Sequence, residues 1–352
     1  MHLCHVEIRN FKGLRSFSAS FLREDGTPRP LTMLLGANGS GKTTVLQAIA
    51  LVVALATRKR EEPGAFDWPG FLIERIGSAG ITRVALRLGF DETERAATIG
   101  LHRRWRQSPL PPAVLRSVPD TVADLPQITV VFENGTLRCE EGPEALALCL
   151  GRYFIRTILR GQPALRQSFR DVGDVFWFDQ NRNLLSVAME TPGIEGLRQY
   201  LITWYATQHT SVPRLGRVDY LRDIEERFAV LFPGAKFVGV EPRPGLSSAS
   251  VADSYFLIER NGTIYDLAEM SSGEQAVFPL LFDLVRLEVA RSLVLIDELE
   301  LHLHPPQQQA LLSSLRKIGP QCQFVMTTHS PYLESVMPDD EEIRLEGGPR
   351  CL

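Results

Sequence analysis

The sequence predicts an α/β protein with a mainly parallel central sheet, an N-terminal antiparallel β layer and a mostly helical inserted lobe. Three observations predict this class. Buried apolar strands alternate with helical patterns late in the chain, which is typical of a parallel sheet. The N-terminal segment alternates apolar and polar residues on both sides of a turn, as antiparallel strands do. A glycine-rich loop lies between a buried strand and an apolar helix.

In the first half of the chain, two strands are expected within residues 3–21, around a turn at 10–13. Residues 58–80 are expected to form a loop. Further strands are expected at 31–35, 82–90, 97–105 and 128–140, the last interrupted by Asn134-Gly135, a good hairpin turn.

In the second half, a hairpin is expected around Asn261-Gly262. Helices are expected at about 143–160, 194–209, 217–231, after 269, at about 306–317 and near 331–336. Strands are expected at 175–178, 293–296 and 324–327. No internal repeat or sustained heptad pattern occurs.

Bulk composition narrows the class of protein. The 352 residues are enough for about two domains. A formal charge of -4 gives no global basic field of the kind that binds nucleic acid, although a local basic face stays open. The five cysteines form no C-x-x-C pair and no secretory signal is visible, so we expect a reduced, cytoplasmic location. The apolar run 45–56 is too short to span a bilayer and predicts a buried helix and no membrane partner.

The first candidate site is "LLGANGSGKTT", which fits G-x-x-x-x-G-K-[ST] after a strand and before a helix, the context of a P-loop. Its glycines let backbone N–H groups turn toward phosphate oxygens, and the helix adds its positive end. Lys42 supplies a charge for the β- and γ-phosphates, and the Thr43 hydroxyl is offered to Mg²⁺. The residues expected to bind nucleotide here are Asn38, Gly39, Ser40, Gly41, Lys42, Thr43 and Thr44.

Acidic and histidine side chains follow two later strands. Asp297 and Glu298 end the strand 293–296, at the carboxyl edge where α/β sheets bind ligands. Adjacent residues of a strand point to opposite faces, so we expect Asp297 to hold Mg²⁺ and Glu298 to polarise the attacking water. His329 follows the next apolar strand and is expected to contact the γ-phosphate or this water. An acidic helix cap and a structural histidine are the alternatives.

A second small-residue loop, "EMSSGEQAVFPLL" at 269–281, also runs into an apolar helix and has the local chemistry of an anion site. The order P-loop, Ser271–Gln275, Asp297-Glu298 and His329, together with "IRNFKGL" and "DELELHLHP", resembles an ABC-type ATPase head of the RecF/SMC branch. The likeness is to the AAA-15/AAA-21 group, which includes the overcoming-lysogenization-defect ATPases. It covers about residues 3 to 345.

The resemblance implies that two heads face each other head to tail and that each signature loop caps the γ-phosphate held by the other P-loop. The residues so implied are Ser271, Gly273 and Glu274 in the signature loop, and His304 in the D-loop that contacts the opposing subunit. Gln180 in "WFDQNRN" corresponds to the Q-loop residue that senses Mg²⁺ and water, although this segment is also good turn chemistry. Lys12, with Asn10 and Phe11, resembles residues near the base or α-phosphate. Leu299 and Ser272 depart from the usual Pro and Gly.

The resemblance also implies a domain division: a discontinuous ABC-type ATPase core at 1–90 and 255–352, and an inserted α/β lobe at 91–254 with its Q-loop near 178–183. The implied function is an ATPase switch with ATP and Mg²⁺, a homodimer or higher oligomer. It would control DNA engagement or a separately encoded effector, a nuclease or toxin, in antiphage defence. The alternative is a RecF-like DNA recombination or repair ATPase. A transporter's ATPase subunit is disfavoured by "IRNFKGL" and the compact insert.

Two basic clusters keep DNA binding open. Arg152, Arg156 and Arg160 recur at i, i+4 and i+8 of an expected helix, with Tyr153 and Phe154 between them. "HRRWR" at 102–106 is a second cluster. Either could contact phosphate backbone; the alternative is a solvated arginine face. His302 and His304 lack a third zinc ligand nearby, and the acidic run 339–342 is interpreted as a solvated turn.

Overall fold

In the computed structural model, the described residues are 1–66, 68, 71–78, 80–178, 193–209, 219–244, 254–301, 303–319 and 321–346. They form two compact units. Unit 1 comprises Met1–Trp177, Val289–Leu299 and Pro320–Leu352, and unit 2 comprises Phe178–Glu288 and Glu300–Gly319. The division into a core and an inserted lobe at 91–254 stays a prediction. Among the described residues, no helix is both long and apolar enough to cross a membrane.

An antiparallel sheet forms the N-terminal layer of unit 1, as predicted. Its strand order is β2-β1-β4-β5-β6. At the expected hairpin, Asn134 and Gly135 both have positive φ, 45° and 91°, which matches the twist of the flanking strands. The strands are β1 (His2–Phe11), β2 (Leu14–Ser20), β4 (Arg83–Gly89), β5 (Gln127–Glu133) and β6 (Thr136–Cys139).

The second sheet of unit 1 has the order β13-β3-β12-β11-β7, and the pairs β13–β3, β3–β12 and β12–β11 are parallel. Every residue of β3, β11 and β12 is buried, as expected for a parallel sheet covered on both faces. The mainly parallel sheet is thus confirmed; β13 was not predicted. The strands are β3 (Leu31–Leu35), β7 (Val175–Phe178), β11 (Leu293–Ile296), β12 (Gln323–Thr327) and β13 (Glu342–Arg344).

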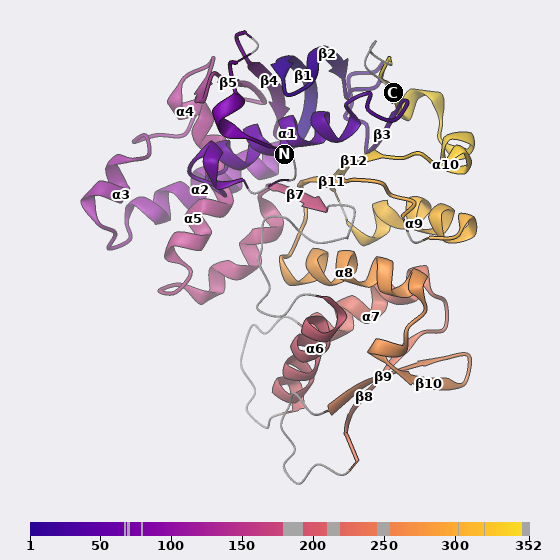
Figure 1. Ribbon diagram of the computed structural model, residues 1–352. Helices are drawn as coiled ribbons and strands as arrows, with labels where there is room; N and C mark the ends of the chain where they lie inside the picture. The colour runs from indigo at the N-terminus through magenta and orange to yellow at the C-terminus, as the bar shows by residue number, and fades with distance from the viewer. Residues whose placement is uncertain are drawn as a thin grey trace. The chain divides into compact units, whose positions relative to one another are not determined.

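Helix α1 (Lys42–Ala56) contacts strands of both sheets, including β1, β4 and β12 (Figure 1). Its residues from Val45 to Ala56 are buried, which confirms the helix predicted at 45–56. Because α1 carries the P-loop at its N-terminus, the two sheets together fix where that loop ends. Helix α10 (Pro331–Val336) follows β12, also as predicted.

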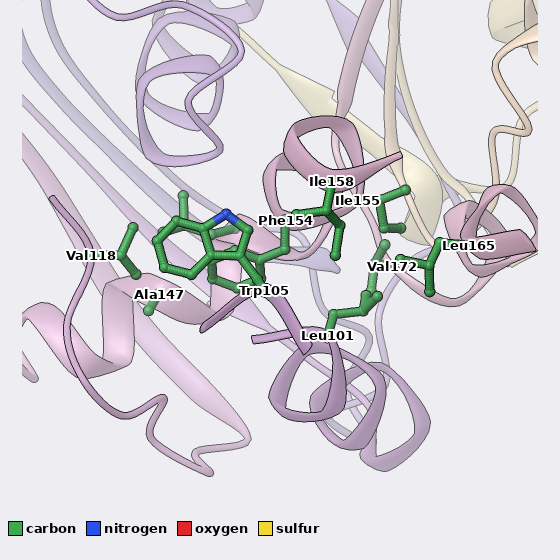
Figure 2. Packing of buried hydrophobic residues seen from close by; sticks show 10 residues of the cluster. Leu101, Trp105, Val118, Ala147, Phe154, Ile155, Ile158, Leu165 and Val172 are labelled. Carbon is green, nitrogen blue, oxygen red and sulfur yellow. The ribbon is translucent and has the colours of Figure 1, made fainter. Parts of the chain in front are cut away.

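The strand predicted at 97–105 is wrong, because this segment belongs to helix α2 (Glu92–Arg106). The Asp91 carboxylate accepts a hydrogen bond from the Glu94 N–H at 2.9 Å and caps the helix. Leu101 and Trp105 recur at i and i+4 and enter an apolar cluster with Phe154 (Figure 2). The neighbouring helices are α3 (Pro112–Arg116), α4 (Pro143–Leu146), α5 (Gly151–Ile158) and the 3-10 segments η3 (Ala147–Leu150) and η4 (Pro163–Asp171).

Unit 2 has its own core, built around helix α8 (Ser272–Arg286), which contacts α6, α7 and α9 (Figure 1). The rings of Trp204 and Phe282 stack with centroids 5.2 Å apart, and Phe228 meets Phe278 edge-on at 5.5 Å. The helices predicted at 194–209 and 217–231 are confirmed, whereas β8 was not foreseen. The other elements are α6 (Gly193–His209), α7 (Tyr220–Leu231), α9 (Pro305–Ile318), β8 (Lys236–Pro242), β9 (Ser254–Arg260) and β10 (Thr263–Asp266).

Candidate functional site

The P-loop of unit 1 has a backbone that only glycine fits at two positions. A Cβ on Gly36 would lie 2.7 Å from the Ser40 Oγ and 2.8 Å from the Leu345 carbonyl oxygen. Gly41 has φ 99° where the loop enters α1, a left-handed conformation that favours glycine. Ser40 Oγ is buried and has no hydrogen-bond partner among the described residues. The loop is therefore a tight cradle built from backbone, which suits phosphate oxygens.

Lys42 lies at the base of this cradle with only 6% of its surface exposed. Its Nζ donates to the Gly36 carbonyl at 2.8 Å and to the Ala37 carbonyl at 3.1 Å. The side chain therefore reaches back across the loop and holds its charge where phosphate oxygens would bind. That this charge serves the β- and γ-phosphates of a nucleotide stays a prediction from the sequence.

Asp297, which follows β11, meets the helix that carries the P-loop. The Thr43 Oγ1 lies 3.1 Å from both carboxylate oxygens of Asp297. A hydroxyl and a carboxylate at one point are the oxygen ligands that Mg²⁺ prefers, commonly with waters and substrate phosphates completing its shell. The glycine cradle and this oxygen pair thus fit a nucleotide phosphate and Mg²⁺. Residues more than 250 positions apart in the sequence are brought together as predicted.

Glu298 has an unusual backbone conformation for a residue with a side chain, with φ 50°. Its N–H donates to the Thr327 Oγ1 at 2.8 Å, and the next N–H, of Leu299, donates to the Thr327 carbonyl at 3.0 Å. Left-handed backbone of this kind costs about 1 kcal/mol or more and concentrates at functional sites. β11 ends at Ile296, so Asp297 and Glu298 both lie after the strand, and the expectation that they alternate across it is wrong. The left-handed residue Glu298 follows directly after Asp297.

His329 also lies beside the P-loop. It is exposed and lines a pocket of ≈ 290 Å³ that Gly36 and Ala37 line as well. Ser330 caps helix α10, its Oγ accepting from the Leu333 N–H at 3.4 Å, and so fixes the chain immediately after His329. The structure therefore brings His329 to the start of the phosphate cradle.

Lys12 contacts the P-loop helix rather than a loop residue. Its Nζ donates to the Gln47 Oε1 at 2.6 Å, and burial lowers the pKa of Lys12 from its ordinary value. Next to it, Leu14 lies 3.2 Å from the position that a Cβ on Gly41 would take. The β1–β2 turn is therefore held against the cradle. Sequence reasoning missed Gln47, although its place one helical turn after Thr43 was a signal for it.

The signature segment belongs to unit 2, where Ser271 caps helix α8. Ser271 Oγ accepts from the Glu274 N–H at 3.4 Å, and Glu274 Oε2 accepts from the Ser271 N–H at 2.8 Å. Glu274 is buried and also accepts from Arg260 and Tyr265, each at 3.0 Å. Burial alone would raise the pKa of Glu274, but the hydrogen bonds from Ser271, Tyr265 and Arg260 outweigh it and lower the pKa. Burial and, after it, the hydrogen bond to Glu274 raise the pKa of Tyr265 to about 12. Glu274 therefore shapes the loop, while Ser271 is exposed.

Gly273 is packed against the helix that follows the D-loop. A Cβ on Gly273 would lie 2.2 Å from the Gln307 Nε2. The Gln307 Oε1 in turn accepts from the His304 N–H at 3.1 Å, in the capping box of α9. Within unit 2, one glutamine side chain thus joins the first turn after the signature to the end of the D-loop. His304 is exposed. Sequence reasoning missed Gln307, which stands three residues after a helix cap.

The predicted Q-loop residue Gln180 lies outside the described part of the chain, as does His302, for which zinc binding was not expected. Within the described part, no group of three or more His, Cys, Asp and Glu side chains is arranged to hold a metal ion. Glu341, in the acidic run interpreted as a solvated turn, is instead buried and pairs with Arg23 at 3.0 Å.

Arg152, in helix α5, is only 4% exposed. It therefore fits neither of the two interpretations of the sequence, a DNA-binding face or a solvated arginine face. Arg152 donates to the Val172 carbonyl at 3.1 Å and to the Phe169 carbonyl at 2.9 Å. Arg156 reaches the buried Asp174 at 3.5 Å. In "HRRWR", His102 and Trp105 are buried and only Arg103 and Arg104 are exposed. Most of these side chains therefore make contacts within unit 1. The helical periodicity of the sequence could not distinguish a buried arginine from a solvated one.

Comparisons with known proteins agree with this geometry. A family model described as "AAA domain, putative AbiEii toxin, Type IV TA system" matches residues 156–335, and one described as "AAA ATPase domain" matches residues 1–83. The Septu protein PtuA of Bacillus mycoides (strain KBAB4) is 23% identical over 353 residues, 98% of this chain and 40% of that protein. The "Retron Ec83 probable ATPase" of Escherichia coli is 32% identical over 101 residues, 25% of this chain and 19% of that protein. The chain spans less than half the length of these relatives.

Among solved structures, an SMC head bound to the C-winged helix domain of ScpA is similar, with a TM-score of 0.51 and 14% identity over 95% of this chain and 91% of that one. This likeness concerns the fold, and it confirms the predicted ABC-type head. The first family model matches more than half of the chain. The protein therefore belongs to this AAA family, and its fold is that of the ABC-type ATPase heads of the SMC/RecF-like branch.

Proposed function

We propose that the chain hydrolyses ATP in the presence of Mg²⁺ and that two copies dimerise head to tail around the nucleotide. The observation that carries the hydrolytic part is the meeting of Thr43 and Asp297 directly behind the P-loop. It combines a phosphate cradle with an oxygen pair suited to a divalent cation, at one edge of a buried parallel sheet.

The roles of the residues follow from their positions. Lys42 binds the β- and γ-phosphates, and Thr43 and Asp297 hold Mg²⁺. When bound, the metal ion neutralises charge on the phosphates. Glu298, which follows the strand in a left-handed backbone conformation, orients the attacking water and accepts its proton. His329 lies beside Gly36 and Ala37 and contributes a hydrogen bond at the γ-phosphate.

The dimer rests on the signature loop. Ser271 is exposed at the N-terminus of α8, a helix of 15 residues whose positive end favours an anion. The resemblance to ABC-type heads implies that the anion bound at this second site is the γ-phosphate held by the P-loop of a partner copy. Ser271, Gly273 and Glu274 are the residues proposed to form this second anion site, and His304 of the same chain is proposed to contact the opposing subunit. Gln180 is proposed as the Q-loop residue.

ATP-driven closing and opening of such a dimer would act as a switch for a separately encoded effector, a nuclease or toxin, in antiphage defence. The matches to a Septu protein and a retron ATPase support this setting. A RecF-like role on DNA is the competing function. Purification of the protein with its bound partners distinguishes the two: a nuclease or toxin supports the switch, and DNA alone favours the RecF-like role.

Hydrolysis itself is tested by phosphate release from ATP with Mg²⁺ or EDTA. The wild type should turn over only with Mg²⁺, and Glu298→Gln should be slower by roughly 10²–10⁴-fold, the usual contribution of a general base. Glu226→Gln, in a surface ion pair of α7, is the matched control. Wild-type turnover by Glu298→Gln would assign the base to another residue.

A further inference from the structure

Thr327 is the last residue of β12, and its hydroxyl makes two hydrogen bonds to the acidic segment that follows β11. It donates to the Asp297 Oδ1 at 2.6 Å and accepts from the Glu298 N–H at 2.8 Å. A threonine hydroxyl has one proton, and this one is committed to Asp297. Only 1% of Thr327 is exposed, so water does not compete for these contacts.

The backbone of Thr327 adds a third contact, its carbonyl accepting from the Leu299 N–H at 3.0 Å. Glu298 is thus held from both sides, through its own N–H and through that of the next residue. A left-handed non-glycine residue persists only where its surroundings over-determine it. Thr327 supplies that constraint for Glu298.

The same hydroxyl restricts the Asp297 carboxylate. Thr327 Oγ1 and Thr43 Oγ1 approach it from two elements, β12 and α1, so the carboxylate is fixed before any cation binds. Partners that orient a metal ligand commonly change metal affinity or activity by 10–100-fold when they are removed. We propose that Thr327 is a positioning residue that presets both Asp297 for Mg²⁺ and Glu298 for water activation, an inference that rests on the proposed function.

Thr327→Val tests the proposal, because valine keeps the shape and removes the hydroxyl. Thr327→Ser restores a hydroxyl. Thr32→Val is a matched control on the neighbouring strand β3: Thr32 pairs with Val325 of β12, is fully buried, and its hydroxyl has no hydrogen-bond partner among the described residues. It undergoes the same chemical change in the same sheet without touching the acidic segment.

The measurement is the affinity for a fluorescent ATP analogue, titrated with Mg²⁺ and repeated in EDTA. We expect Thr327→Val to need roughly 10–100-fold more Mg²⁺ for its half-maximal effect, with its affinity in EDTA unchanged. Thr327→Ser and Thr32→Val should behave as the wild type. Thermal melting shows that each variant is folded at the assay temperature.

Three results would overturn the proposal. A Thr327→Val protein that melts earlier but has the wild-type Mg²⁺ requirement would reduce Thr327 to a structural residue. An equal change in Thr32→Val would assign the effect to the sheet. If the wild type and Thr32→Val show no Mg²⁺-dependent ATP affinity, the proposed function fails, and the role of Thr327 fails with it.

Discussion

The hydroxyl of Thr43 lies 3.1 Å from both carboxylate oxygens of Asp297, joining the helix after the P-loop to the end of β11. The two residues come from the beginning and the end of the chain, and the parallel sheet brings them together. The proposed Mg²⁺ site of unit 1 depends on this arrangement.

Lys42→Ala should remove the charge that Lys42 holds against the cradle. Loss of a charged hydrogen bond worth about 2–3 kcal/mol should raise the Kd for ATP by roughly 100-fold. Fluorescence or calorimetric titration measures it, with the exposed Lys236→Ala as the control. Unchanged ATP affinity in Lys42→Ala would overturn the assignment of the cradle.

Glu298→Gln should bind ATP normally, because neither the cradle nor the Thr43–Asp297 pair is altered. With hydrolysis slowed, the proposed ATP-bound dimer should accumulate. Light scattering after gel filtration, with ATP and with ADP, measures the shift from monomer to dimer. A variant that binds ATP, does not hydrolyse it and stays monomeric would contradict the sandwich while leaving the catalytic role intact.

Arg152→Met should lower the free energy of unfolding by about 2–3 kcal/mol, because the Val172 and Phe169 carbonyls lose their donor. Arg104→Met, on the exposed face of α2, should change it by less than about 0.5 kcal/mol. Urea unfolding measures both. Equal stability of the two variants would show that Arg152 is not a structural residue and would reopen its role at a phosphate backbone.

Stability should depend on pH through His2, whose side chain lies against Gly89. Burial, aided by the N-terminal charge, lowers the pKa of His2 from 6.5 to about 4. Between these values the folded protein binds fewer protons than the unfolded chain, so stability is complete above pH 6.5 and falls as the pH drops toward 4, by up to about 3 kcal/mol. In His2→Gln this part of the stability loss at acid pH should disappear. Urea unfolding at pH 7 and pH 5 measures it. The same pH slope in both proteins would contradict it.

Much of the fold and of the unit 1 site was predictable because it depends on local pattern. The P-loop, the buried strands β3, β11 and β12, and the carboxylates that follow β11 each have a signature in a few adjacent residues. Thr327 and Gln47 were missed as contributors because their contacts come from residues distant in sequence, and a threonine after an apolar strand is not distinctive by itself. Arg152 was misinterpreted for the same reason: helical spacing gives a face, but not what covers it.

The segment 97–105 shows a different limit. Its apolar residues suit a strand over a short window, and the deciding signal was the Asp91 cap with Glu94 three residues later. In unit 2, the sequence identified Ser271 and Gly273 by resemblance. It did not show that Gly273 is packed against Gln307, a contact that makes Gly273→Ala ambiguous as a test of phosphate binding.

The central claim, that each ATP is enclosed by two chains, is tested most directly by mixing two variants. Lys42→Ala disables the cradle, and Ser271→Asp places a negative charge at the signature while keeping a helix cap, as Asp266 with Glu269 already does elsewhere in this chain. Each variant alone should be inactive. An equal mixture should recover about a quarter of the wild-type ATPase rate, because half of its dimers hold one intact composite site. An inactive mixture, together with wild-type turnover by a monomer, would contradict the account.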